Sequence, residues 1–177
     1  MIYLILKKKN KSDLKIEVKG EHKAKKGILF KKINLVENKN SILIKDLSLS
    51  NGYKINYIKY ITLNYLDQDN LRNNIQITKK NKSYSINGAS LNINQAIDNF
   101  INSKNKKKYN LFKDDFKINI KIDQTYLDKN NIIKNLKGYF IYNNNEIYES
   151  KLESSFSNNK KIKFSINTDN GKKITTL

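Results

Sequence analysis

The stretch FKINIKIDQTYL, residues 116 to 127, alternates apolar and polar side chains without a break over eight residues. Four apolar side chains fall on one side of an extended chain, namely Phe116, Ile118, Ile120 and Ile122. Lysine, asparagine and aspartate occupy the positions between them. Because successive strand side chains point to opposite faces, the pattern predicts a β-strand with one wet face and one apolar face.

The same alternation recurs along most of the chain. Further strands are predicted over residues 13–19, 27–36, 41–50, 53–66, 73–80, 82–89, 132–142, 146–156 and 161–167. Asparagine-rich turns separate them, among them ENKN at 37–40 and a tight hairpin near Lys80, Asn81 and Lys82. Residues 53–66 are apolar on both faces, so we expect that strand to be covered on both sides.

One segment changes period. Ile93, Ala96, Ile97, Phe100 and Ile101 recur at three- and four-residue spacing, which predicts a short amphipathic helix over 92–103. Asn92 or Asn94 would cap it. The expected fold class is therefore mainly β, a long antiparallel meander forming a curved, groove-like sheet with one short helix. One helix does not cover so wide a sheet, so its apolar face needs a second sheet, another chain or a ligand.

Composition excludes several function classes. The net charge is +19, yet Arg72 is the only arginine among 35 basic residues. Such a charge attracts anionic surfaces, whereas specific base recognition relies on arginine's planar pair of donors, so we expect no specific nucleic-acid partner. An AT-rich genome would also produce this excess of lysine, asparagine and isoleucine. The charge alone therefore identifies no partner.

No catalytic constellation emerges from the sequence. Cysteine is absent and His22, in a lysine-rich stretch, is the only histidine, so triads and His- or Cys-based metal sites have no residues to form them. The carboxylate pairs Asp67–Asp69 and Asp114–Asp115 fit turn-forming roles better than acid–base chemistry. No glycine-rich nucleotide loop is present. We expect no enzyme activity, no metal and no cofactor.

The C-terminal half resembles a known family. SINGASLNINQAIDNFI, then the long strand from Phe116 and the element LKGYFIYNNNEIYESKL with Leu136 and Gly138, is similar to the repeat-rich region of large AsmA-like envelope proteins of Gram-negative bacteria. A TDNG turn, Thr168 to Gly171, follows. The resemblance is clearest over residues 83–177. It implies that residues 1–177 are one β-rich segment of a longer repeat protein.

The resemblance also implies a function. Proteins of this family carry phospholipid acyl chains between the inner and outer membranes along a β-sheet trough with an apolar interior. They lie in the periplasm, part of the cell envelope, and are anchored in the inner membrane through a segment not present in this chain. The candidate lining residues here are Phe116, Ile118, Ile120, Ile122, Ile162, Phe164 and Ile166.

Other interpretations of these residues stay open. The seven apolar side chains would also suit an ordinary core, packed against the helix and one another. The chain as a whole would also suit a structural or adhesive β-protein with a basic exterior. A weak polyanion binder, whose affinity falls steeply as salt rises, is the third alternative.

Overall fold

Twelve β-strands make up almost all of the structure. The computed structural model describes residues 2–7, 13–23, 27–94, 115–143, 146–169 and 172–177. The strands are β1 (Ile2–Lys7), β2 (Asp13–Lys23), β3 (Gly27–Glu37), β4 (Asn40–Leu49), β5 (Ile55–Leu66), β6 (Arg72–Lys80), β7 (Ser83–Asn92), β8 (Phe116–Tyr126), β9 (Ile132–Asn143), β10 (Glu146–Phe156), β11 (Lys161–Asp169) and β12 (Lys172–Thr176). The mainly β prediction is confirmed.

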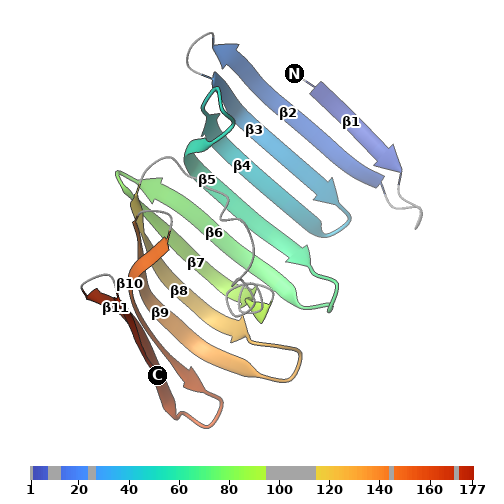
Figure 1. Ribbon diagram of the computed structural model, residues 1–177. Coiled ribbons are helices and arrows are strands. Elements are labelled where there is room, and N and C mark those ends of the chain that lie inside the picture. The colour runs from blue at the N-terminus through green and yellow to red at the C-terminus, as the bar shows by residue number, and fades with distance from the viewer. Residues whose placement is uncertain (1, 8–12, 24–26, 95–114, 144–145, 170–171) are drawn as a thin grey trace.

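All twelve strands join one open sheet in the order of the chain, with β1 and β12 at its two edges (Figure 1). Neighbouring strands are antiparallel with one exception, because β7 and β8 pair in parallel. The prediction of an antiparallel meander is wrong at this point. Parallel neighbours need a connection of a dozen or more residues, and the stretch between Asn92 and Phe116 is long enough to return to the starting end of the sheet.

Two further sequence predictions concern the helix at 92–103 and the strand at 53–66. Most of the predicted helix at 92–103 lies outside the described residues; at its start, Asn94 N donates to Asn92 Oδ1 at 3.0 Å. The strand expected to be covered on both sides, β5, packs chiefly against its sheet neighbours β4 and β6. Within the described ranges no second layer lies on β5, so its double coverage is not found.

Asparagine forms the turns, as predicted. Asn38 in the β3–β4 turn and Asn81 in the β6–β7 turn have φ of 51° and 56°, in the left-handed region that asparagine tolerates better than most residues. Asn159, between β10 and β11, has φ of 62°. These short connections keep consecutive strands adjacent and antiparallel.

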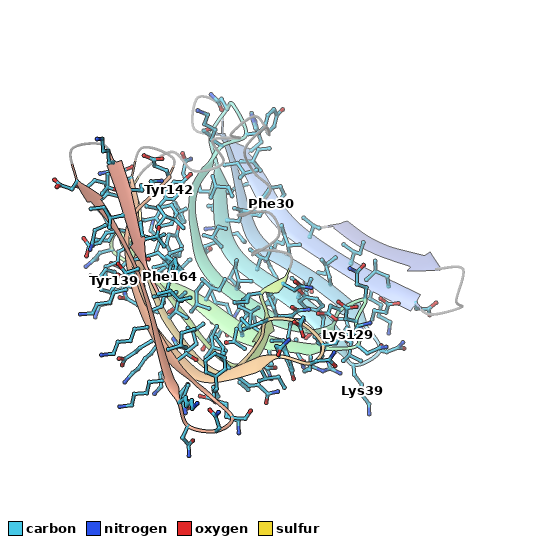
Figure 2. The ribbon with its side chains drawn as sticks, turned by 60° about the horizontal axis from the view of Figure 1, so that its bottom comes forward. Phe30, Lys39, Lys129, Tyr139, Tyr142 and Phe164 are labelled. Carbon is cyan, nitrogen blue, oxygen red and sulfur yellow. The ribbon has the colours of Figure 1, made fainter. Side chains whose placement is uncertain are left out.

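Irregularities inside the strands bend the sheet. Asp46 in β4 and Asn135 in β9 have φ of 49° and 55° although both lie within strands. Register shifts occur in four strand pairs, including one at Lys19/Gly20 and one at Glu153/Ser155. Such β-bulges bend the strand that carries them and increase its twist. Figure 2 shows the curved strands that result.

Candidate functional site

One row of apolar residues crosses ten consecutive strands on one face of the sheet. Directly paired residues in a sheet lie on the same face. The pairing runs through Val18, Ile33, Ile44, Ile61, Ile77, Ile86, Ile120, Gly138, Leu152 and Phe164, which we call the central apolar row. With strands about 4.8 Å apart, the row extends roughly 43 Å across the sheet. No charged residue interrupts it.

The adjacent row on the opposite face has the reverse chemistry. It runs through Glu17, Asn34, Leu43, Thr62, Gln76, Asn87, Lys121, Lys137, Glu153 and Lys163, which we call the central polar row. Leu43 is its only apolar member. Along these two rows, from β2 to β11, one side of the sheet is therefore apolar and the other polar.

A second apolar row lies about 7 Å from the first on the apolar face. Its members are Ile16, Leu35, Ile42, Leu63, Ile75, Gly88, Ile122 and Leu136. Burial changes along this row. The residues on β2 to β5 are half-buried, whereas Ile75, Ile122 and Leu136 are only 5%, 1% and 7% exposed.

A small core explains the burial at the C-terminal end of the second row. Ile122, Ile133 and Leu136 pack together, with Leu91, Leu152 and others against them. Ile133 reaches the same cluster as Leu136, three residues on, because the left-handed Asn135 interrupts the two-residue alternation between them. The apolar face is thus sealed locally by its own side chains around β8 and β9.

Polar residues flank the two apolar rows along the strands, and β6 shows this most clearly. Along this strand the apolar face carries Asn73, Ile75, Ile77 and Lys79 in turn, so two apolar residues lie between two polar ones. The Lys79 ammonium lies 5.1 Å from the ring centre of Tyr57 and 5.7 Å from that of Tyr84. Aromatic faces stabilise the cation there. A lysine at this edge was not expected from the sequence.

All seven sequence-predicted lining residues lie on the apolar face. Ile120 and Phe164 belong to the central apolar row, and Ile122 belongs to the second row. Ile118 and Ile166 share a third row through Phe140 and Ser150, while Phe116 pairs with Tyr142 and Ile162 with Ser154. Ile122 and Ile166 are 1% and 2% exposed, so little of their surface is open to a ligand. The other five are half-buried.

An aromatic cluster closes one end of the face near Phe116. The Phe116 ring stacks on Tyr142 with centroids 4.9 Å apart and meets Tyr84 edge-on at 5.4 Å. Tyr84 is buried, and burial raises the pKa of its phenol although the Ile58 N–H donates to its oxygen at 3.4 Å. Such ring pairs add specific geometry to apolar burial. The alternating pattern did not reveal this cluster because its members come from three strands.

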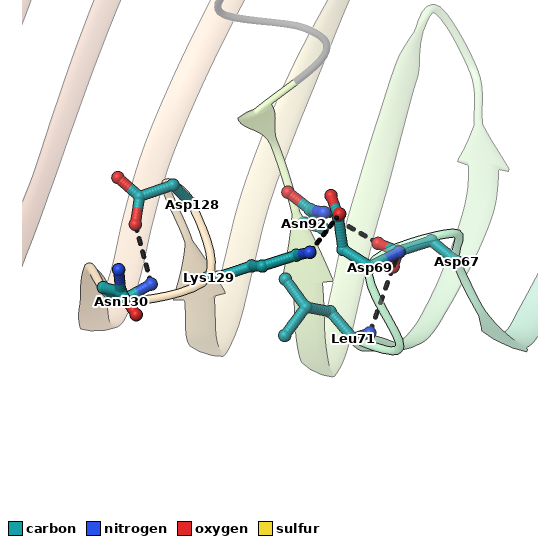
Figure 3. A network of polar contacts seen from close by, with 7 residues as sticks. All are labelled: Asp67, Asp69, Leu71, Asn92, Asp128, Lys129 and Asn130. Atoms are coloured by element: carbon teal, nitrogen blue, oxygen red, sulfur yellow. Dashed lines mark hydrogen bonds and ion pairs between the residues drawn. The ribbon is translucent and has the colours of Figure 1, made fainter.

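Hydrogen bonds centred on Asp67 hold the opposite end of the sheet (Figure 3). Its Oδ1 accepts the backbone N–H groups of Asp69 and Leu71 at 2.9 and 3.0 Å, which confirms the predicted turn-forming role. Its Oδ2 accepts the side-chain amides of Asn73 and Asn92. Partial burial alone would raise the pKa of Asp67, but these four hydrogen bonds outweigh it and lower the pKa below the ordinary value.

The same end joins strands on both sides of the parallel pair. The Lys129 ammonium lies 3.0 Å from Asp69 Oδ1, which connects the β8–β9 turn with the β5–β6 turn (Figure 3). Within the β8–β9 turn, Asp128 accepts hydrogen bonds from the Asn131 side chain and from the backbone N–H groups of Asn130 and Asn131, and these lower its pKa. Of the two candidate carboxylate pairs, Asp67 and Asp69 thus hold turns together, while Asp114 lies outside the described residues.

A hollow lies on the apolar face between the ends of β2 to β5. Its volume is about 290 Å³, and Leu14, Leu35, Ile42 and Tyr65 contribute to it together with Glu37, Asn40, Ser41 and Leu66. Leu35 and Ile42 belong to the second apolar row. This is the part of the row in which the side chains are half-buried, so the open hollow and the sealed core occupy opposite halves of one face.

Comparisons with known proteins give no relative for this chain. No protein-family model matches the sequence, and neither the curated proteins nor the solved structures contain a match. In the part of the chain that the structure describes, no cluster of histidine, cysteine or carboxylate residues is suited to hold a metal ion. The same residues include no helix long and apolar enough to span a membrane.

Proposed function

We propose that the apolar face binds phospholipid acyl chains, as a non-enzymatic segment of an AsmA-like envelope protein. In this proposal the curved sheet forms a trough whose interior is the apolar face and whose exterior is the polar face. The segment would carry lipid between the inner and outer membranes, with membrane anchoring supplied elsewhere in a longer protein. The family assignment rests on the sequence resemblance of residues 83–177.

The observation that supports the proposal best is the central apolar row. It continues across ten strands without a charged side chain, and every member that has a side chain is half-buried rather than sealed. A globular β-protein normally covers such a face with a second layer. The described residues form one layer only.

Continuity matters because of the energetics of a lipid tail. At about 0.8 kcal/mol per CH₂ group, moving a 16-carbon chain through water would cost on the order of 12 kcal/mol. A path that replaces water with apolar contact at every step removes most of that barrier. The 290 Å³ hollow at Leu14, Leu35, Ile42 and Tyr65 offers one such contact at the N-terminal half.

The experiment uses two adjacent residues of β4 that lie on opposite faces. Ile44 belongs to the central apolar row and Leu43 to the central polar row. A fluorescent fatty-acid probe is bound to the purified chain and displaced with phospholipid. We expect Ile44→Lys to abolish probe binding, because a buried charge would interrupt the path.

Leu43→Lys is the matched control, since it makes the same chemical change one residue away. We expect this variant to bind the probe as the unaltered chain does. Circular dichroism and the urea midpoint establish that both variants keep the sheet. Equal loss or equal retention of probe binding in two folded variants would contradict the proposal.

A further inference from the structure

The polar face gathers lysines over its last strands. Three neighbouring rows of the polar face cross β8 to β11, and they contain Lys117, Tyr139 and Lys121 respectively. Together these rows hold five lysines and only two glutamates. The lysines are Lys117, Lys121, Lys137, Lys151 and Lys163, and the glutamates are Glu149 and Glu153. By contrast, the polar-face residues paired along the middle of β5 to β7 are uncharged, namely Thr62, Asn64, Asn74, Gln76, Thr78, Ser85 and Asn87. A second group of lysines, Lys19, Lys32 and Lys45, crosses β2 to β4 on the same face, so the positive charge of this face lies on both sides of the uncharged middle strands.

A hollow of about 710 Å³ opens among these lysines. Lys137, Lys151 and Lys163 come from three neighbouring strands, and Tyr139 lies with them; we call this site the lysine hollow. Thr176 and Leu177 from the C-terminal end also line it. Gly138, Leu152 and Phe164 border it as well, but they belong to the central apolar row, so the side chains of Leu152 and Phe164 lie on the other face. In Figure 2 Tyr139 and Phe164 are labelled on these C-terminal strands. The hollow combines positive charge with apolar contact.

Its charges are only partly neutralised. Lys137 pairs with Glu153 at 2.7 Å. Lys117 lies 4.2 Å from the ring centre of Tyr139, whose hydroxyl donates to Glu149. Lys151 has no ion-pair partner among the residues that the structure describes, and it lies directly opposite Tyr139 and Ser165. Glu153 also lines the hollow and lies directly opposite Lys163. The hydrogen bond from Lys137 lowers the pKa of Glu153, and the charge of Lys163 helps to lower it. An anionic group entering the hollow would therefore meet Lys151 first and would share Lys163 with Glu153.

An exposed apolar side chain accompanies the charge. Ile174 lies on β12, two residues before Thr176, and pairs with Asn167 of β11. It is on the polar face and its side chain is 56% exposed. Lysines with aliphatic stems beside a tyrosine and an exposed isoleucine are typical of surfaces that lie at the boundary between water and lipid.

We infer that the lysine hollow and Ile174 dock on the headgroups of an anionic bilayer. The lysines are spread over neighbouring strands in two dimensions, which matches a layer of phosphates better than a single linear chain of them. Lysine is a point charge that attracts phosphate without reading a base. Because docking uses the polar face, it is independent of the acyl-chain binding proposed for the apolar face.

The test measures sedimentation of the 177-residue chain with vesicles of phosphatidylcholine containing 30% phosphatidylglycerol, at low salt. We expect Lys151→Gln with Lys163→Gln to weaken partitioning about 25-fold, which corresponds to about fivefold for each lysine near an anionic surface. The matched control is Lys19→Gln with Lys45→Gln, which removes the same charge from the same face of β2 and β4. Because salt screens charges over about 10 Å, lysines far from the docked surface should matter less, and we expect the control to weaken partitioning by about threefold or less.

Further arms separate the bilayer from other anions. Ile174→Asn should weaken vesicle binding about fivefold and leave heparin binding unchanged, because only the bilayer accepts the side chain. Equal losses in the two double-lysine variants would show that overall charge, and no particular site, drives binding. The inference is also overturned if Ile174→Asn leaves vesicle binding unchanged, or if millimolar glycerol phosphate releases the chain from the vesicles. Circular dichroism confirms that each variant is folded.

Discussion

The two halves of the apolar face have the same residue chemistry and different packing. On β2 to β5 both apolar rows are half-buried, and a hollow lies beside Leu35 and Ile42. On β8 and β9, Ile122, Ile133 and Leu136 form a sealed core. The difference indicates that the C-terminal half supplies stability, whereas the N-terminal half leaves apolar surface available to a ligand. Apolar alternation alone does not distinguish these two uses.

The largest expected effect compares equivalent truncations in the two halves. Ile122→Ala should lower the free energy of unfolding by about 3 kcal/mol, because it leaves a cavity in the sealed core. Ile44→Ala, on the half-buried central apolar row, should cost about 1 kcal/mol, since water or a ligand fills the space. Urea unfolding of both variants measures the difference. Equal losses would mean that the two halves are packed alike.

A second comparison concerns glycines in bulged regions of each half. Gly138 has φ of 145°, and a Cβ there would lie 1.9 Å from the Lys151 carbonyl oxygen. Gly138→Ala should therefore cost about 2–3 kcal/mol of unfolding free energy, from backbone strain and from the displaced strand. Gly20→Ala in β2 should cost about 1 kcal/mol or less, because its Cβ would approach the Leu29 oxygen to 3.0 Å without a positive φ. The same urea titration checks both, and a costlier Gly20→Ala would reverse our assignment of the rigid half.

The smallest expected effect concerns the hydrogen bonds that tie the halves together at Asp67. Asp67→Ala should cost about 1–2 kcal/mol at pH 7, because the buried Asn73 side chain loses one of its partners. The pKa of Asp67 is lowered in the folded chain. Its stabilisation is therefore complete above the ordinary value of 3.8 and disappears as the pH falls through the lowered folded pKa.

Unfolding free energies of the variant and the unaltered chain, measured between pH 7 and pH 2, test this prediction. The gap between the two should stay constant down to about pH 4 and narrow below it. Asp128→Ala is the comparison variant. The pKa of the Asp128 carboxylate is also lowered, but this residue lies in an exposed turn, where water replaces its hydrogen-bond partners. A gap that widens on acidification would contradict the assigned role of Asp67.

Much of the sheet follows from the sequence because the strand period is two. The alternation at Phe116, Ile118, Ile120 and Ile122 places these residues on one face, and the register then joins them to Phe164 on β11. Asparagine turns were found for a similar reason, since left-handed backbone at Asn38 and Asn81 has a local preference. Local patterns suffice where the structure is decided locally.

The remaining features depend on contacts between distant strands. The parallel pairing of β7 with β8 is set by the long connection and not by either strand. Asp46 and Asn135 bend strands from within, although the same residue types usually mark turns. The burial of Ile122 and Ile166 depends on neighbours from other strands, so their pattern is indistinguishable from that of half-buried Ile118.

The most direct test of an open apolar face is photolabelling of the chain with a diazirine fatty acid, followed by peptide mapping. Our account predicts labels on the central and second apolar rows of β2 to β5, around Ile33, Ile42 and Ile44, and their loss when phospholipid competes. Labels confined to the polar face, or labels that phospholipid does not displace, would contradict it.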